Sequence, residues 1–159
     1  MTDREVIDQA LAALGDANGL KDFALGEDGS VGLSLGEGLD LALEWDETSR
    51  HFLIYLSVVP LPDTAPELLQ LYHRLLVLNC LGIGTHNAVL SVHPEMKLVL
   101  MHMNVFVEDL SATRIMRTVD HLLEARNAVL AALAEDLSEA SETEEAQGPP
   151  PVDPMNMRV

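Results

Sequence analysis

The stretch LLQLYHRLLVLNCLGIG, residues 68–84, decides the fold because it is too apolar for an ordinary surface helix. At 3.6 residues per turn, one apolar stripe consists of Leu68, Leu71, Leu75 and Leu78. A second stripe consists of Leu69, Tyr72, Leu76 and Cys80. A helix that is apolar nearly all round is buried on more than one side. We expect one side to pack on the protein's own sheet and the other to require a second surface.

Capping boxes indicate where two helices begin. Thr2 and Glu5 have this spacing, and the residues after them repeat on one helical face as far as Gly15. That face consists of Val6, Ile7, Ala10, Leu11 and Leu14. Thr64 and Glu67 have the same spacing and open the leucine-rich helix, which Gly82 and Gly84 are expected to end.

The period changes to two between Gly19 and Pro60, where apolar residues alternate with small or acidic ones. Two further strands are expected at residues 86–93 and 97–105, before a third helix that Asp109 or Ser111 caps. The sequence therefore predicts an α+β fold, an antiparallel twisted sheet packed with three helices in the order α-β-β-β-α-β-β-α.

The composition divides the chain into a folded domain, residues 1–137, and a tail, residues 138–159. The tail is acidic, contains three consecutive prolines and carries almost no aliphatic side chains before its end. Such a segment buries too little apolar surface to offset the entropy of ordering, so we expect the tail to be disordered.

Charge limits the choice of partners. Twenty-six acidic residues against nine basic ones give a formal net charge of −17, which repels phosphate backbones and anionic lipid headgroups. We therefore expect neither nucleic acid nor membrane as a partner. The N-terminus has no recognisable secretion signal and no apolar run is long enough to span a membrane, so a cytoplasmic protein is expected.

Signals for catalysis, cofactors or metals are weak. The six histidines show neither the His-x3-His spacing nor a Glu-x-x-His motif, and Cys80, the single cysteine, sits in a leucine-rich helix that favours an inert thiol. The glycine-bearing segments 32–36 and 82–84 lack the lysine and spacing of phosphate loops. We predict a binding protein without catalytic residues, metal ligands or cofactor.

The order of elements resembles the class I chaperones of bacterial type III secretion systems, the Tir chaperone family. The resemblance rests on the amphipathic first helix, on acidic strands that close on VVPLP at residues 58–62, and on a second helix that ends in LLVLN at residues 75–79. The strand pair 86–105 and the helix that opens at Asp109 complete it. The resemblance covers nearly all of residues 2–137.

The resemblance implies a cytoplasmic bacterial homodimer that binds the non-globular N-terminal segment of one or a few secreted effectors. Such a chaperone keeps the segment soluble and secretion-competent without ATP hydrolysis. A homodimer also provides a partner for the second apolar side of the leucine-rich helix, as an isologous contact. The predicted dimer interface consists of Leu68, Leu71, Tyr72, Leu75, Leu76, Leu78 and Asn79.

Effector binding is expected at apolar positions that the core does not require, where an extended segment could lie or add a strand. The predicted effector-binding residues are Val6, Ala10, Ala13, Phe23, Leu33 and Leu35. Two alternatives stay open. One is an adaptor or regulator of the same fold that binds a folded partner, and the other is an enzyme with a cleft built from His86, His93, His102 and nearby acids.

Overall fold

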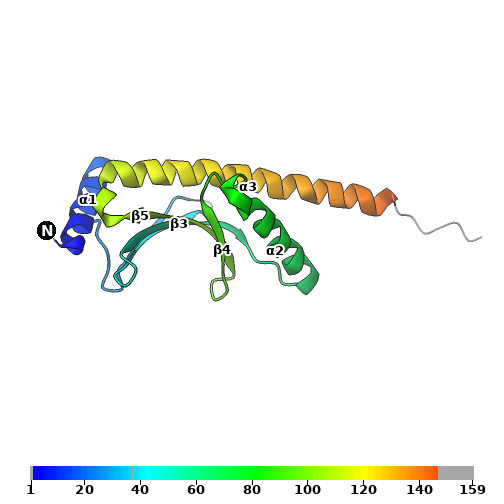
Figure 1. Ribbon diagram of the computed structural model, residues 1–159, viewed down its shortest axis with the longest axis horizontal. Coiled ribbons are helices and arrows are strands. Elements are labelled where there is room, and N and C mark those ends of the chain that lie inside the picture. The colour runs from blue at the N-terminus through cyan, green and yellow to red at the C-terminus, as the bar shows by residue number, and fades with distance from the viewer. Residues whose placement is uncertain (1, 37, 147–159) are drawn as a thin grey trace, which may run out of the picture.

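The computed structural model describes residues 2–36 and 38–146, with side chains as far as residue 135. Its elements are α1 (Asp3–Asn18), β1 (Ser30–Ser34), β2 (Asp40–Asp46), β3 (His51–Pro60), α2 (Ala65–Asn79), η1 (Cys80–Gly82), β4 (Val89–His93), β5 (Leu98–Phe106), η2 (Val107–Asp109) and α3 (Ala112–Ala146). The predicted order of three helices and five strands is confirmed, with two short 3₁₀ turns in addition. In Figure 1, α3 extends along the sheet, α1 lies near the start of α3 and α2 lies beside β4.

The first helix begins as the sequence predicts. The hydroxyl of Thr2 accepts a hydrogen bond from the Glu5 backbone N–H, and the Glu5 carboxylate accepts one from the Thr2 N–H. The helix continues three residues past Gly15, to a left-handed cap at Gly19 (φ 71°). Gly15 is required for packing instead, because a Cβ there would lie 2.8 Å from the Phe23 Cβ.

The five strands form one antiparallel sheet in the order β1-β2-β3-β5-β4. Opposite residues share a face, so Leu43, Ile54 and Met103 lie side by side on the face toward the helices. The buried strand residues of this face are Leu41, Leu43, Phe52, Ile54, Leu56, Leu90, Val99, Met101 and Val105. The opposite face is more open, and Tyr55 and His102 lie opposite each other on it, both half-buried.

A β-bulge interrupts the pairing of β3 with β5 between Ser57 and Val59. The guanidinium group of Arg126 on α3 donates hydrogen bonds to the carbonyl oxygens of Ser57, at 2.8 Å, and Val58, at 3.4 Å. These carbonyls come from the irregular part of the strand, where pairing is locally disrupted. One side chain therefore connects the long helix to the bulged strand.

The second helix ends earlier than its glycines suggested, and its N-terminus differs from the prediction. Thr64 makes no side-chain hydrogen bond to the backbone, because its hydroxyl donates to the Glu67 carboxylate instead. The prediction of a second capping box is therefore wrong, although proline does occupy the first turn. The helix stops at Asn79, and Leu81 in η1 has φ 56°, a left-handed conformation that branched-chain residues seldom adopt.

The third helix is capped by Ser111, whose hydroxyl accepts a hydrogen bond from the Arg114 backbone N–H. The folded domain was expected to end at residue 137, but the helix continues to Ala146, and Figure 1 shows it extending beyond the sheet. Residues 147–159 of the predicted tail lie outside the described residues. The division into a domain at residues 1–137 and a disordered tail at residues 138–159 stays a prediction.

Candidate functional site

Two hollows of similar volume lie on the surface of the protein. The first is formed by α1 together with η2 and the start of α3. This first hollow, of about 440 Å³, is lined by Val6, Gln9, Ala10 and Ala13 of α1 and by Val107, Glu108, Leu110, Ser111 and Ala112. We call it the α1 hollow. It contains three residues of the predicted effector-binding set, Val6, Ala10 and Ala13.

Helical spacing explains why these three residues line the α1 hollow. Val6, Ala10 and Ala13 follow one another at intervals of four and three residues, so they lie on one edge of the helix. Ile7 and Leu11 are fully buried beside them and fix the helix to the body. Alanine side chains fill little volume, which leaves the wall of the hollow open to an incoming side chain.

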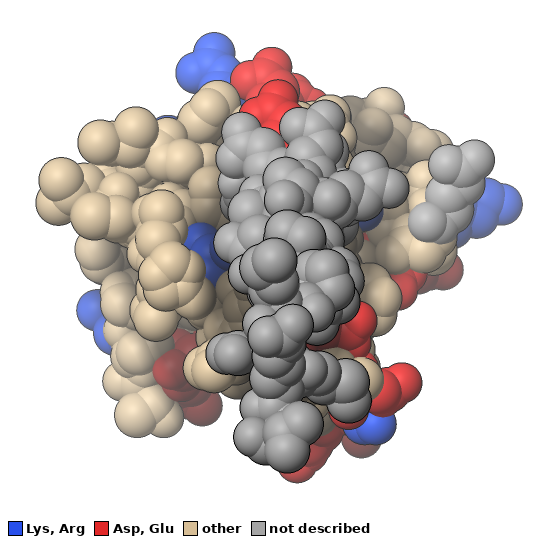
Figure 2. All heavy atoms as spheres, turned by 90° about the vertical axis from the view of Figure 1, so that its right-hand side faces the viewer, with Lys and Arg blue, Asp and Glu red and all other residues tan. Residues whose placement is uncertain are grey.

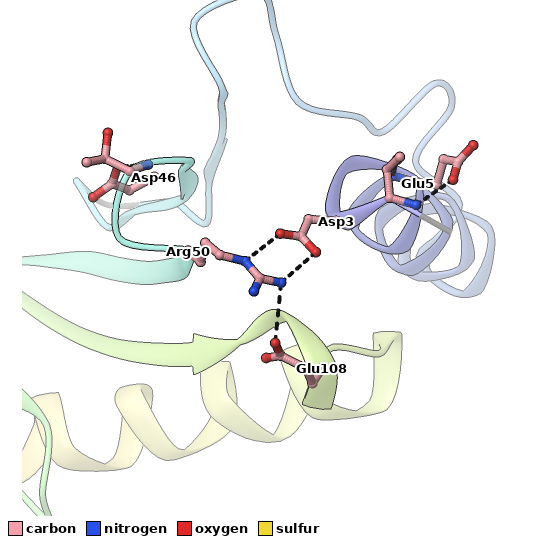
Figure 3. A network of polar contacts seen from close by, with 7 residues as sticks. Asp3, Glu5, Asp46, Arg50 and Glu108 are labelled. Carbon is pink, nitrogen blue, oxygen red and sulfur yellow. Dashed lines mark hydrogen bonds and ion pairs between the residues drawn. The ribbon is translucent and has the colours of Figure 1, made fainter.

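Arg50 holds the two walls of the α1 hollow together (Figure 3). Its guanidinium group donates two hydrogen bonds of 2.8 Å to the Asp3 carboxylate on α1 and one of 3.4 Å to Glu108 on η2. The hydrogen bonds from Arg50 lower the pKa of Asp3 below its ordinary value. Because Arg50 and Glu108 are largely accessible to water and Asp3 is partly so, this clamp contributes orientation more than stability.

The other predicted effector-binding residues lie apart from the α1 hollow. Phe23 is 8% exposed and packs against Gly15, so it is part of the core. Leu33 is half-buried on the edge strand β1, opposite Leu41, and Leu35 is 45% exposed just beyond that strand. Ala10, although it lines the α1 hollow, is only 5% exposed and also belongs to the core. The structure therefore divides the predicted set into two accessible residues of the hollow, Val6 and Ala13, two core residues, Ala10 and Phe23, and an edge-strand pair.

The residues of the predicted dimer interface face in different directions. Leu75 is only 5% exposed within the single chain, and Leu68, Leu71 and Leu78 are partly covered on the same side of α2. Asn79 is engaged with β4, because its side-chain amide exchanges hydrogen bonds with the backbone of Leu90. This side of α2 packs on the sheet, as the first apolar stripe requires.

Tyr72 and Leu76 belong to the other stripe and line the second hollow, of about 420 Å³, between α2 and β4. The remaining lining residues are Leu75, Asn79, Leu90, Ser91 and Val92. Leu76 is 72% exposed, so it is available to a second molecule.

Several exposed apolar residues of this region were not part of the predicted interface. They are Leu69, Val77, Leu81, Ile83 and Val89. We call these residues, together with Leu76, the α2 face. Figure 2 shows a broad area with few charged side chains to the left of the grey residues. This left side corresponds to the front of Figure 1, where α2 and β4 lie. The second apolar stripe of the helix, which contains Leu69 and Leu76, indicated this face in the sequence. The predicted interface nevertheless took most of its residues from the first stripe.

The histidines of the enzyme alternative are not gathered in one cleft. His93 pairs with Leu98 and His102 with Val89, so along the strands they are four residues, or about 13 Å, apart. His86 lies in the loop before β4, with its ring 6.2 Å from that of His121. Burial lowers the pKa of His102, which has Ser91 Oγ 3.4 Å from its Nδ1.

The described part of the chain shows neither a metal-ion cluster nor a membrane-spanning helix. Within residues 2–36 and 38–135, whose side chains are described, no group of three or more histidine, cysteine, aspartate or glutamate side chains is arranged to hold a metal ion. The helices in these ranges also lack the combined length and apolar character that crossing a bilayer requires.

Comparison with known proteins decides the family. Residues 9–130, from within α1 to within α3, match the family described as Tir chaperone protein (CesT) family. This protein belongs to the Tir chaperone protein (CesT) family. The resemblance is thereby confirmed, and the matched residues include the α2 face and the lining of the α1 hollow except Val6. None of the proteins with curated descriptions matches this CesT-family chain.

Solved structures share the CesT-family fold at low sequence identity. A chain of the ExsC–ExsE complex has a TM-score of 0.68 at 17% identity, covering 79% of this chain and 92% of that one. A chain of the HopA1–SchA chaperone–effector complex has a TM-score of 0.64 at 15% identity, with coverages of 78% and 92%. A chain of the heterodimeric ExoU–SpcU complex from the type III secretion system of Pseudomonas aeruginosa has a TM-score of 0.54 at 20% identity, with coverages of 79% and 95%. These matches confirm the α+β fold.

Proposed function

We propose that this CesT-family protein is a cytoplasmic type III secretion chaperone of a bacterium. Its homodimer binds the non-globular N-terminal segment of a secreted effector and keeps that segment soluble and secretion-competent without ATP hydrolysis. Family membership supports the chaperone class, and similar folds occur in complexes described as chaperone–effector and type III secretion assemblies. The observation that carries effector binding is the α1 hollow, an open and largely apolar site on a firmly packed helix.

The α2 face supports a homodimer. The six residues of the α2 face lie within residues 69–89 and are all at least 48% exposed, and large apolar side chains gathered in one exposed region mark an interaction site. A second copy of the chain presents the same apolar face, so a two-fold contact would cover both at once. A stable dimer of this kind buries on the order of 1,600 Å² in total.

The α1 hollow suits apolar side chains from an extended segment. Val6, Ala10, Val107 and Leu110 provide apolar walls, while Gln9 and Ser111 provide polar groups at the rim. Its volume of about 440 Å³ is enough for individual side chains and too small for a folded domain to enter. A segment without tertiary structure could therefore place its apolar residues here while its backbone stays on the surface.

The decisive experiment compares two substitutions on α1. Ala13 lies in the α1 hollow, whereas Ala12 is also exposed and lies outside its lining. Tagged wild type, Ala13→Asp and Ala12→Asp are expressed in the native host under secretion-inducing conditions, and captured proteins are identified by mass spectrometry. We expect a secreted protein to be captured by wild type and Ala12→Asp and lost with Ala13→Asp, at unchanged thermal unfolding temperature.

Limited proteolysis of the captured complex tests the binding mode. A protected N-terminal segment that is cleaved rapidly when free supports the chaperone. A captured protein that is equally resistant alone and in the complex would instead support the adaptor alternative, in which the partner is folded. Equal capture by Ala13→Asp and wild type would refute the α1 hollow as the effector site.

A further inference from the structure

A third hollow, of about 330 Å³, lies between α3 and the loop that leads into β4. Its lining residues are His86, Asn87, Met103, Arg114, Arg117, Thr118 and His121. Two guanidinium groups and two imidazoles therefore surround one hollow, on a chain whose formal net charge is −17. Among the side chains that the structure describes, no carboxylate lines this hollow, which we call the arginine hollow.

The arginines of this hollow differ from Arg4 and Arg50, whose guanidinium groups are paired with carboxylates. Arg4 pairs with Asp8 at 3.1 Å, and Arg50 pairs with Asp3 and Glu108. Among the described residues, by contrast, the guanidinium groups of Arg114 and Arg117 have no ion-pair partner within 4.0 Å and no hydrogen bond. The chain contains many more acidic than basic residues, yet none of the described carboxylates pairs with these two guanidinium groups. Both are therefore free to bind an external anion.

The opposite wall is shaped by a strained loop. His86 and Asn87 have φ values of 52° and 67°, so two successive residues other than glycine adopt the left-handed conformation. His121 Nε2 lies 2.6 Å from the His86 carbonyl oxygen, and because a carbonyl only accepts, Nε2 carries the proton and donates. This hydrogen bond fixes the loop beside α3.

We propose that the arginine hollow binds a carboxylate side chain of the polypeptide that the chaperone carries. This inference rests on the proposed function, since it assigns a second contact to the same bound segment. Arg114 and Arg117 are one helical turn apart, and guanidinium groups form paired hydrogen bonds with carboxylates. Met103 and the Thr118 methyl group provide apolar contact for the methylene groups of a glutamate.

The acidity of the chain favours a single carboxylate over a polyanion. Screening in physiological salt confines interactions of exposed charges to about 8 Å, so the two arginines act on a group inside the hollow. A nucleic acid or an anionic membrane would extend over the acidic surface around it and be repelled. A glutamate or aspartate on an otherwise uncharged segment meets only the local positive potential.

The probe is a five-residue peptide with one central glutamate flanked by alanines, acetylated and amidated, titrated into the isotopically labelled full chain and followed by NMR. We expect saturable shifts at the amides of His86, Asn87 and residues 114–121. The matched glutamine peptide should bind about tenfold more weakly, because it cannot form charge-assisted hydrogen bonds. Equal binding of the two peptides would overturn the proposal.

A double variant and a matched control test the assignment to these arginines. Arg114→Gln with Arg117→Gln should weaken the glutamate peptide about tenfold or more. Lys21→Gln with Lys97→Gln removes the same charge from exposed sites outside the hollow and should change binding less than twofold. Equal losses in both variants would mean a general electrostatic effect, and tighter binding of inorganic phosphate or of a twelve-nucleotide single-stranded DNA would mean a phosphate site. Either result overturns the proposal.

An effector-capture experiment distinguishes failure of the carboxylate contact from failure of the proposed chaperone function. If wild type captures an effector segment and the Arg114→Gln, Arg117→Gln variant captures it equally well, the carboxylate contact is refuted while the chaperone function stands. If no effector is captured by wild type although the peptide still binds at the arginine hollow, the proposed function fails and the anion site remains.

Discussion

Asn79 and Leu90 exchange two hydrogen bonds that join the end of α2 to the edge strand β4. The Asn79 Nδ2 donates to the Leu90 carbonyl oxygen at 2.9 Å, and the Leu90 backbone N–H donates to Asn79 Oδ1 at 2.8 Å. A side-chain amide thus pairs with the strand as a neighbouring backbone would. Since β4 lies at the edge of the sheet, this pairing satisfies backbone groups that no further strand reaches.

Replacement of Asn79 by alanine should destabilise the fold by about 1–3 kcal/mol, because the half-buried backbone groups of Leu90 lose both partners. Chemical denaturation followed by circular dichroism measures this loss. Asn127→Ala, on the exposed side of α3, is the matched control and should change stability by less than about 0.5 kcal/mol. Equal stability of Asn79→Ala and the control would show that the pairing is energetically unimportant.

Two neighbouring leucines should separate folding from dimer formation. Leu76→Asp places a charge on the α2 face, where Leu76 is 72% exposed, so we expect a folded monomer. Leu75→Asp places a charge at a site that is 5% exposed. Truncating a core leucine costs about 2–5 kcal/mol of folding stability, and the buried charge should cost at least as much. Light scattering and thermal unfolding measure both. A wild type that is monomeric at micromolar concentration would contradict the proposed dimer.

The clamp at the α1 hollow predicts a titration change at Asp3. In the folded protein the pKa of Asp3 is lowered by Arg50, so the favourable contact is present above the unfolded pKa of 3.8 and is lost as pH falls through the folded value. Arg50→Gln should raise the pKa of Asp3 toward 3.8, measured from its side-chain carboxyl carbon by NMR. Arg4→Gln, which removes a charge that pairs with Asp8, should leave the pKa of Asp3 unchanged.

Burial of His102 predicts that folding stability depends on pH, through loss of hydration and not through an ion pair as at Asp3. Burial lowers its pKa, so the unfolded chain binds a proton more readily than the folded one once pH falls below the ordinary value of 6.5. The free energy of unfolding should therefore fall as pH decreases from 7 through the region below 6.5. His102→Gln should lose part of this decrease in thermal unfolding across pH 7.5 to 5, whereas His73→Gln, at an exposed site, should retain it. Identical pH profiles for wild type and His102→Gln would refute this account.

Local patterns predicted the elements well, because capping and alternation act over a few residues. The Thr2–Glu5 capping box and the alternation that places Leu41 and Leu43 in the core are both present. The same logic failed at Thr64, because a short-range pairing with Glu67 competes with capping of the backbone. Two residue types that suit a cap do not determine which hydrogen bond forms.

The candidate site depended on contacts between distant segments, which periodicity does not encode. The two stripes of α2 were visible in the sequence, but only the placement of β4 shows that Leu75 faces inward and Leu76 outward. Likewise, the α1 edge was predicted from Val6 and Ala13, whereas its opposite wall and the Arg50 clamp come from residues far along the chain. Phe23 is buried because it packs where Gly15 leaves room.

The wall of the α1 hollow is shared by the first helix and by the start of the last one, so the hollow is completed late during synthesis. The ribosome adds about 5–20 residues per second, and the segment between Asn18 and Ala112 therefore takes roughly 5–20 s to emerge after α1. Throughout that interval Ile7 and Leu11 lack the C-terminal helix that later packs beside them. A growing chain has no finished hollow to offer, so if the α1 hollow is the effector site as proposed, binding becomes possible only when translation is nearly complete.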